Sequence, residues 1–281
     1  MTLAFNTQYR IQVISMMLLT LLFFGQSQKS FAQFHEAGVF SGGMGFVGDV
    51  GETKGLNSLS NLKFANGIVY KYNIDAYIAL RASFTKGEIL ADDVDAEEEF
   101  KQNRGLNFHS EITEFAAIIE YNFFKAKRGK EDYHHTPFIF AGLSYFSFNP
   151  QSEYQGVTYD LQELGTEGQL INGDDRYKLN QLAIPFGMGY KVNMGKKWRL
   201  TMELNLRKTF TDYIDDASED YAFNNSIASS PTIHFSDPTS NGSIGRQRAS
   251  SNNTDWFYTT SFAITYVIQR PKVRCTTSQI R

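Results

Sequence analysis

Charged residues of both signs recur at alternate positions in several apolar segments, and they are the strongest candidates for chemistry in this sequence. Arg199, Glu203 and Arg207, for example, share one parity within a single stretch. If such positions face a common interior, their carboxylates and cations would pair as salt bridges. The predicted lumen charge network is Arg81, Glu114, Glu120, Lys191, Glu203 and Arg207. We predict a structural role for it, because a catalytic pocket would need a nucleophile with a base, or several histidines.

Other clusters of reactive side chains lack the spacing that catalysis or metal binding requires. His134 and His135 are adjacent, so in a turn or an extended chain they are poorly placed to share one metal. The acidic run from Asp92 to Glu99 lacks the spacing of a calcium loop, which favours a solvated loop tip. A second acidic cluster is interpreted in the same way and comprises Asp212, Asp215 and Asp216. The sequence therefore predicts no enzyme activity, no metal site and no cofactor.

The start of the chain has the composition of a secretory signal peptide. Met1–Ala32 contains no Asp or Glu, and an apolar run covers Ile11–Gly25. Ser30 and Ala32 supply the small residues that a signal peptidase reads, so we predict cleavage before Gln33. A membrane helix would need about 20 apolar residues, which is more than this run provides. The sequence therefore predicts export of residues 33–281.

Charge and cysteine content narrow the class of the exported part. Removing Arg10 and Lys29 leaves 25 basic and 30 acidic residues, a net charge of −5, which argues against nucleic-acid binding. Cys275 is the only cysteine and cannot form an internal disulfide. No low-complexity linker or repeat divides the chain, so we predict one domain with a short tail at residues 271–281.

The stretch Trp198–Tyr213 shows the clearest period. Trp198, Leu200, Met202, Leu204 and Leu206 alternate with Arg199, Thr201, Glu203, Asn205, Arg207 and Thr209. Alternation over about nine residues is typical of a β-strand, because successive side chains leave opposite faces. Aromatic residues at both ends and aliphatic residues between them are typical of a membrane-barrel strand. A soluble barrel with its apolar face turned inward is the alternative.

Eight such strands are predicted, and the lengths of their connections favour the membrane barrel. They cover Glu36–Val47, Lys63–Tyr72, Tyr77–Thr85, Leu106–Phe124, Phe138–Phe148, Leu179–Asn193, Trp198–Tyr213 and Trp256–Ile268. Long polar loops are predicted at Lys86–Gly105, Asn149–Lys178 and Ile214–Thr254, all on one side if both termini lie on the other. Outer-membrane barrels combine long outer loops, short periplasmic turns and an even strand number. We predict an eight-stranded antiparallel transmembrane β-barrel that contacts outer-membrane lipids of a Gram-negative-type bacterium.

Several segments also resemble the PorG-like family. The segments that carry the resemblance are His35–Phe40, Gly48–Gly51, Phe140–Phe146, Arg207–Asp216, Asn253–Tyr258 and Arg270–Cys275. The resemblance implies an outer-membrane barrel of the type IX secretion machinery that associates with a periplasmic ring. It implies neither enzyme activity nor a cofactor.

If that resemblance holds, the partner-binding surface must face the periplasm. The candidate surface is basic and comprises Lys125, Lys127, Arg128, Lys130, Lys196, Lys197, Lys272 and Arg274. These cations would equally suit contact with lipid headgroups. One rival function is recognition of a ligand or a host or neighbouring cell through the outer loops. A second rival is a lipid-modifying hydrolase, for which His109 beside Ser110 is the available pair.

Overall fold

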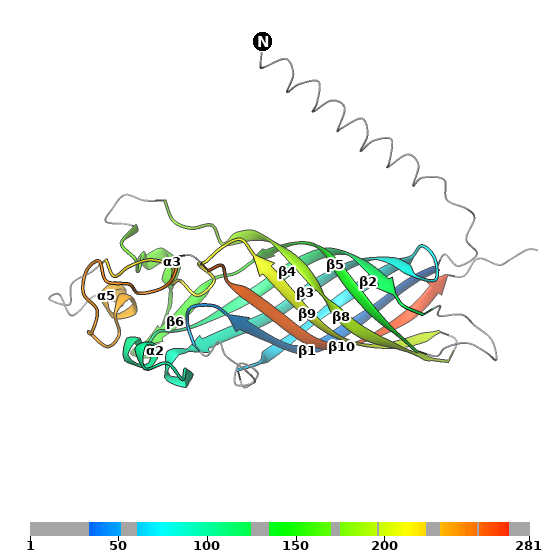
Figure 1. Cartoon of the computed structure of the whole chain (residues 1–281), viewed down its shortest axis with the longest axis horizontal. Helices are drawn as coiled ribbons and strands as arrows, with labels where there is room; N and C mark the ends of the chain where they lie inside the picture. Colours follow the sequence, from blue (N-terminus) through cyan, green and yellow to red (C-terminus); the bar gives the residue numbers. More distant parts are fainter. Residues whose placement is uncertain are drawn as a thin grey trace, which may run out of the picture.

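The computed structural model describes residues 34–51, 61–124, 135–169, 175–195, 197–222, 231–251 and 253–269. Eight antiparallel strands close into a barrel, which confirms the predicted fold class (Figure 1). They are β1 (Phe34–Val47), β2 (Lys63–Asn73), β3 (Ile78–Asp92), β4 (Asn107–Asn122), β5 (His135–Ser147), β8 (Asn180–Met194), β9 (Trp198–Thr209) and β10 (Trp256–Gln269). Pairing of β1 with β10 and of β3 with β4 completes the ring, so the barrel has no open edge.

The alternation of β9 places its two faces as the sequence predicts. Met202 and Leu204 face outward and are about half exposed, whereas Thr201 and Asn205 are buried inside the barrel. Outward apolar residues continue around the wall and include Val39, Ile68, Leu80, Ile119, Leu143, Met188, Phe262 and Ile264. A continuous apolar exterior of this kind is favourable against lipid and costly in water.

Strand β3 extends to Asp92, so the prediction of a polar loop starting at Lys86 was wrong. The reason is that the polarity of the wall inverts along this strand. Beyond Thr85 the inward residues are apolar, as at Ile89, while the outward Lys86 is exposed and paired with Glu111 of β4. This end of β3 therefore has the pattern of a wall surrounded by water, with its apolar face turned inward.

Two kinds of packing fill the lumen. The half near the long loops contains an apolar core that includes Met44, Phe46, Ile89, Ile112, Phe146 and Phe257. The other half holds charged side chains beside Phe138 and Phe140. Gly42 allows the wall to close, because a Cβ there would lie 1.9 Å from the carbonyl oxygen of Thr260 on β10.

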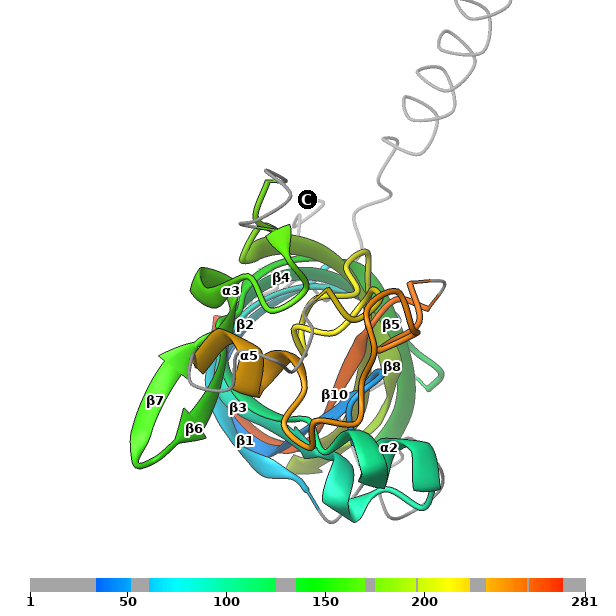
Figure 2. The same cartoon turned by 90° about the vertical axis from the view of Figure 1, so that its left-hand side faces the viewer.

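The long loops fold over one end of the barrel as a cap, which Figure 2 shows end-on. It contains η2 (Asp93–Asp95), α2 (Glu99–Arg104), β6 (Pro150–Tyr154), β7 (Val157–Asp160), α3 (Leu161–Leu164) and α5 (Pro231–Ser236). Sequence reasoning missed the β6–β7 hairpin, which lies inside the predicted loop Asn149–Lys178 and is antiparallel. In the described segments, no helix is long and apolar enough to cross a membrane.

Candidate functional site

Glu120 of β4 is the centre of the lumen charge network. Its carboxylate is fully buried and contacts the Lys71 ammonium at 2.9 Å, the Arg81 guanidinium at 3.0 Å and the Lys191 ammonium at 2.5 Å. Lys191 also donates a hydrogen bond to Oδ1 of Asn122 at 2.8 Å. One carboxylate therefore contacts three buried cations that come from β2, β3 and β8.

Two further groups of ion pairs extend this network along the lumen. Arg81 also contacts Glu203 at 2.6 Å. Arg207 forms a bidentate ion pair with Glu114, at 2.9 and 3.3 Å. Towards the ends of β1 and β9, Arg199 contacts Glu36 at 2.5 Å. The six residues predicted from the sequence thus all lie inside the barrel.

The aromatic rings of the lumen help to hold these cations. The Lys191 ammonium lies 4.2 Å from the centroid of the Phe138 ring, and the Arg81 guanidinium lies 4.5 Å from that of Phe140. Such contacts are strongest where water is excluded. The cavity left beside Arg81 and Asn205 measures about 10 Å³, the minimum volume for one water. Among the residues that the structure describes, the lumen is therefore filled at this level.

The predicted set omitted three members of the lumen network, namely Lys71, Glu36 and Arg199. The sequence had placed Arg199 on the charged face of its strand. Lys71 alternates with the outward Tyr70 and Tyr72, so parity alone could have assigned it to the lumen. Glu36 is isolated among small and apolar residues of β1. It accepts hydrogen bonds from Asn73 and Thr265, so its role depends on both neighbouring strands.

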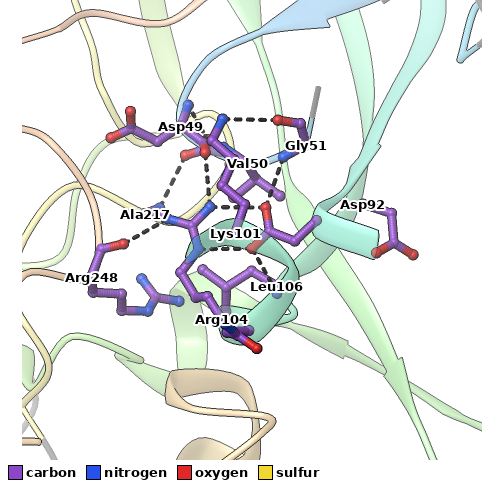
Figure 3. A network of polar contacts seen from close by, with 12 residues as sticks. Asp49, Val50, Gly51, Asp92, Lys101, Arg104, Leu106, Ala217 and Arg248 are labelled. Atoms are coloured by element: carbon purple, nitrogen blue, oxygen red, sulfur yellow. Dashed lines mark hydrogen bonds and ion pairs between the residues drawn. The ribbon is translucent and has the colours of Figure 1, made fainter. Parts of the chain in front are cut away.

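A second polar network lies in the cap, where Asp93 and Arg104 form a buried ion pair. Figure 3 shows Arg104 in this network, beside Asp49 and Arg248. Both carboxylate oxygens of Asp93 contact the guanidinium, at 2.7 and 2.9 Å. The remaining Arg104 donors bind the carbonyl oxygens of Asp49 and Arg248. Arg104 therefore links three separate loops. The prediction of a solvated acidic loop was wrong at Asp93, because a partner eleven positions along the chain compensates its burial.

The cluster at the end of β9 is also buried, contrary to the solvated rim predicted for it. Asp215 accepts hydrogen bonds from the backbone amides of Asp49 and Val50, at 3.1 and 3.0 Å. Asp216 accepts them from the hydroxyls of Thr166 and Tyr177. Asp212 is partly buried. These side chains tie distant loops to the rim of the barrel.

Burial raises the pKa of several cap carboxyls. It raises the pKa of Asp216 to about 6 and that of Asp212 to about 7. Burial and repulsion from Asp49 raise the pKa of Asp215 well above the ordinary value. Burial and repulsion from Asp215 do the same for the pKa of Asp255. The cap is thus built around carboxyl groups for which burial disfavours the ionised form.

We expect the cap to open more readily as the pH rises from about 4 to about 7. Unfolded aspartate has a pKa of about 3.9, so the stabilisation from these groups is complete below that value and is lost as the pH passes the raised folded values. Opening at pH 8 should exceed that at pH 5 roughly tenfold or more, because Asp216 has a pKa of about 6 in the folded cap and of about 3.9 in the unfolded chain. Limited proteolysis of the cap, divided by the cleavage rate of an unstructured peptide at the same pH, measures this. Asp216→Asn should reduce the difference, and equal corrected rates at both pH values would contradict the prediction.

The structure describes only part of the predicted basic surface and of the His134–His135 pair. Lys197 is described and exposed, with its ammonium 5.5 Å from the centroid of the Tyr266 ring. The other seven residues of the basic surface lie outside the described residues: Lys125, Lys127, Arg128, Lys130, Lys196, Lys272 and Arg274. His134 also lies outside them, whereas His135 begins β5 rather than occupying a turn, and it shares a hydrogen bond with the Tyr190 hydroxyl.

His109 and Ser110 do not form a catalytic pair. They are consecutive in β4, so their side chains lie on opposite faces of the wall. Ser110 is fully buried inside, and its hydroxyl accepts a hydrogen bond from the backbone amide of Asn149 at 2.9 Å. The geometry removes the specific pair on which the lipid hydrolase alternative depended.

Several solved structures of bacterial surface and outer-membrane proteins are similar to this chain at low sequence identity. Neisserial surface protein A shares 9% identity over 84% of this chain and 99% of its own, with a TM-score of 0.42. Ail of Yersinia pestis shares 8% over 85% and 99%, with a TM-score of 0.39. The N-terminal β-barrel domain of Pseudomonas aeruginosa OprF shares 11% over 84% and 99%, with a TM-score of 0.36. No curated protein matches the sequence.

One protein family covers almost the whole sequence. Its characteristic pattern matches residues 14–277, which include every strand of the barrel and the entire cap. This chain therefore belongs to the family described as "Domain of unknown function (DUF6089)".

Proposed function

We propose that this chain is a non-enzymatic protein of the bacterial outer membrane that anchors or assembles a type IX-like secretion machinery by contacting its periplasmic ring. The observation that carries the proposal is the filled lumen. A barrel whose centre holds buried ion pairs and room for about one water does not conduct solutes. Its function must then depend on surfaces at its two ends.

The apolar exterior supports the outer-membrane location, and the sequence resemblance to the PorG-like family supports the secretion role. In this arrangement the short turns face the periplasm. Ile74–Asp75 forms one such turn, and the segment between β8 and β9 carries the exposed Lys197. A basic surface there would attract an acidic partner, and its attraction would weaken with salt.

We expect replacement of Lys127, Arg128, Lys196 and Lys197 by Glu to abolish co-purification of the periplasmic ring and to block secretion. Pull-down from detergent-solubilised outer membrane measures the first effect. Cysteine labelling of an Asp95→Cys variant on intact cells verifies that the barrel still inserts with its cap outside.

The matched control reverses four cations of the opposite end, Lys86, Arg176, Lys178 and Lys208, and should leave the ring bound. Loss of the ring in both sets would indicate non-specific repulsion. Secretion that survives the periplasmic set but fails when Gln151–Asp174 is deleted would contradict the proposal.

A second candidate function is recognition of an external ligand through the cap. The observation that favours it is that buried ion pairs, at Arg104–Asp93 and Arg248–Glu167, hold the cap in a defined shape. A preformed surface loses less conformational entropy on binding than a mobile loop.

A further inference from the structure

The cap carries an open groove of about 780 Å³ that serves neither the lumen network nor the Asp93–Arg104 network. Its volume lies within the range of roughly 300–1,000 Å³ that is typical of ligand sites. The lining residues are Glu167 and members of the segments 218–222 and 244–251.

The two segments that form the walls are joined to one another. The amide of Tyr221 donates to the carbonyl of Arg246, and the amide of Gly245 donates to the carbonyl of Tyr221, both at 2.9 Å. Asp220 and Gln247 pair as an antiparallel bridge. The groove therefore has a hydrogen-bonded frame.

Glu167 is buried beside the groove, and only one of its two carboxylate oxygens accepts hydrogen bonds in the described residues. Its Oε1 atom accepts hydrogen bonds from the amides of Ser218 and Glu219, at 2.9 and 3.0 Å, and from the Arg248 guanidinium at 2.7 Å. Among the described residues, its Oε2 atom has no hydrogen-bond partner although the side chain is fully buried. A buried carboxylate oxygen without a donor is costly, and a donor from a ligand would remove that cost.

The charge of the groove is one-sided. Three lining residues carry carboxylates, namely Glu167, Glu219 and Asp220, and no lysine or arginine is among the described lining residues. The wall also includes Ile244, which is 62% exposed, and Ala249. Acidic groups beside an apolar surface suit the charged end and the alkyl stem of a basic side chain.

We propose that this groove binds a ligand with a guanidinium or ammonium group, supplied by a basic peptide segment or by a free polyamine. The cation pairs with Glu219 and Asp220 at the rim and is drawn towards Oε2 of Glu167, while its alkyl part lies against Ile244. The site does not depend on the periplasmic anchoring proposed above, so the two experiments fail independently.

The test measures binding of a dye-labelled hexapeptide of alternating arginine and alanine to the full-length barrel in detergent, by fluorescence polarisation. The double variant Glu219→Gln with Asp220→Asn should weaken binding roughly five- to tenfold, since each exposed charge contributes modestly. Glu167→Gln should weaken it further, with cold gel mobility reporting whether the barrel remains folded. If that variant does not fold, the rim variant decides.

The matched control is Glu153→Gln with Glu163→Gln, which removes the same charge from exposed positions of the cap outside the groove. It should leave the affinity unchanged, and a hexapeptide with glutamate in place of arginine should not bind. Competition by spermidine at micromolar concentration would identify a free polyamine as the source, and its absence would identify a peptide. Equal affinity in the wild type and the rim variant, or an equal loss in the control, would overturn the proposal.

Discussion

Replacing Glu120 by Gln is expected to lower the free energy of unfolding of the barrel by about 3–5 kcal/mol. The glutamine keeps the shape of the side chain but removes the charge that faces Lys71, Arg81 and Lys191. All three cations are buried, so they cannot recover hydration where they lie. Urea titration of the protein in lipid vesicles, with folded and unfolded forms separated on cold gels, measures the change.

The control for this prediction lies on the same strand. Glu111 pairs with Lys86 at 3.1 Å, but both side chains are more than half exposed. Ion pairs of this kind contribute little, because water and salt screen them. Glu111→Gln should therefore leave the unfolding midpoint almost unchanged. A midpoint shift as large as that of the Glu120 variant would show that the lumen network does not govern stability.

Leu204→Arg is expected to cost about 2–4 kcal/mol in the same assay. Leu204 lies at the middle of β9, faces outward and is paired with Thr260 and Met188 of the neighbouring strands. An arginine there would place a charge near the bilayer midplane. Trp198 faces outward at the end of the same strand. Placing a charge there by Trp198→Arg should lower the free energy of unfolding by only about 0–1 kcal/mol. Loss of the ring contact with Tyr266 would add to this effect. If Leu204→Arg and Trp198→Arg had the same cost, a lipid-facing surface would be contradicted.

The alternation of β9 also suggests Asn205→Arg as a comparison, because Asn205 faces the lumen. In a roomy interior this substitution would destabilise the barrel less than Leu204→Arg. The structure shows why it is unsuitable. Asn205 is buried beside Arg207 and next to a cavity of only about 10 Å³, so an added arginine would overpack the lumen and add a cation.

The barrel and the membership of its lumen network were predictable because both depend on local periodicity. Alternation decides which face a side chain occupies whatever its neighbours are, so Glu114, Glu120 and Arg207 could be assigned inward from single strands. Reliance on local periodicity also explains why the predicted third strand ended too early, at Thr85, whereas β3 extends to Asp92. Beyond Thr85 the alternation continues, but the apolar residues now face inward and the charged residues outward. Such a segment resembles a polar loop when only outward apolar residues are counted.

Tertiary structure alone decided which charges meet. Glu120 contacts Lys71 and Lys191 because strand register and closure bring three strands to one level of the lumen, a relation absent from any single segment. The cap shows the same limit more strongly. Asp215 binds the amides of Asp49 and Val50, more than 160 positions away, so its burial has no local signal. An acidic run looks solvated in sequence, and only the fold supplies the amides, hydroxyls and arginines that allow its aspartates to be buried.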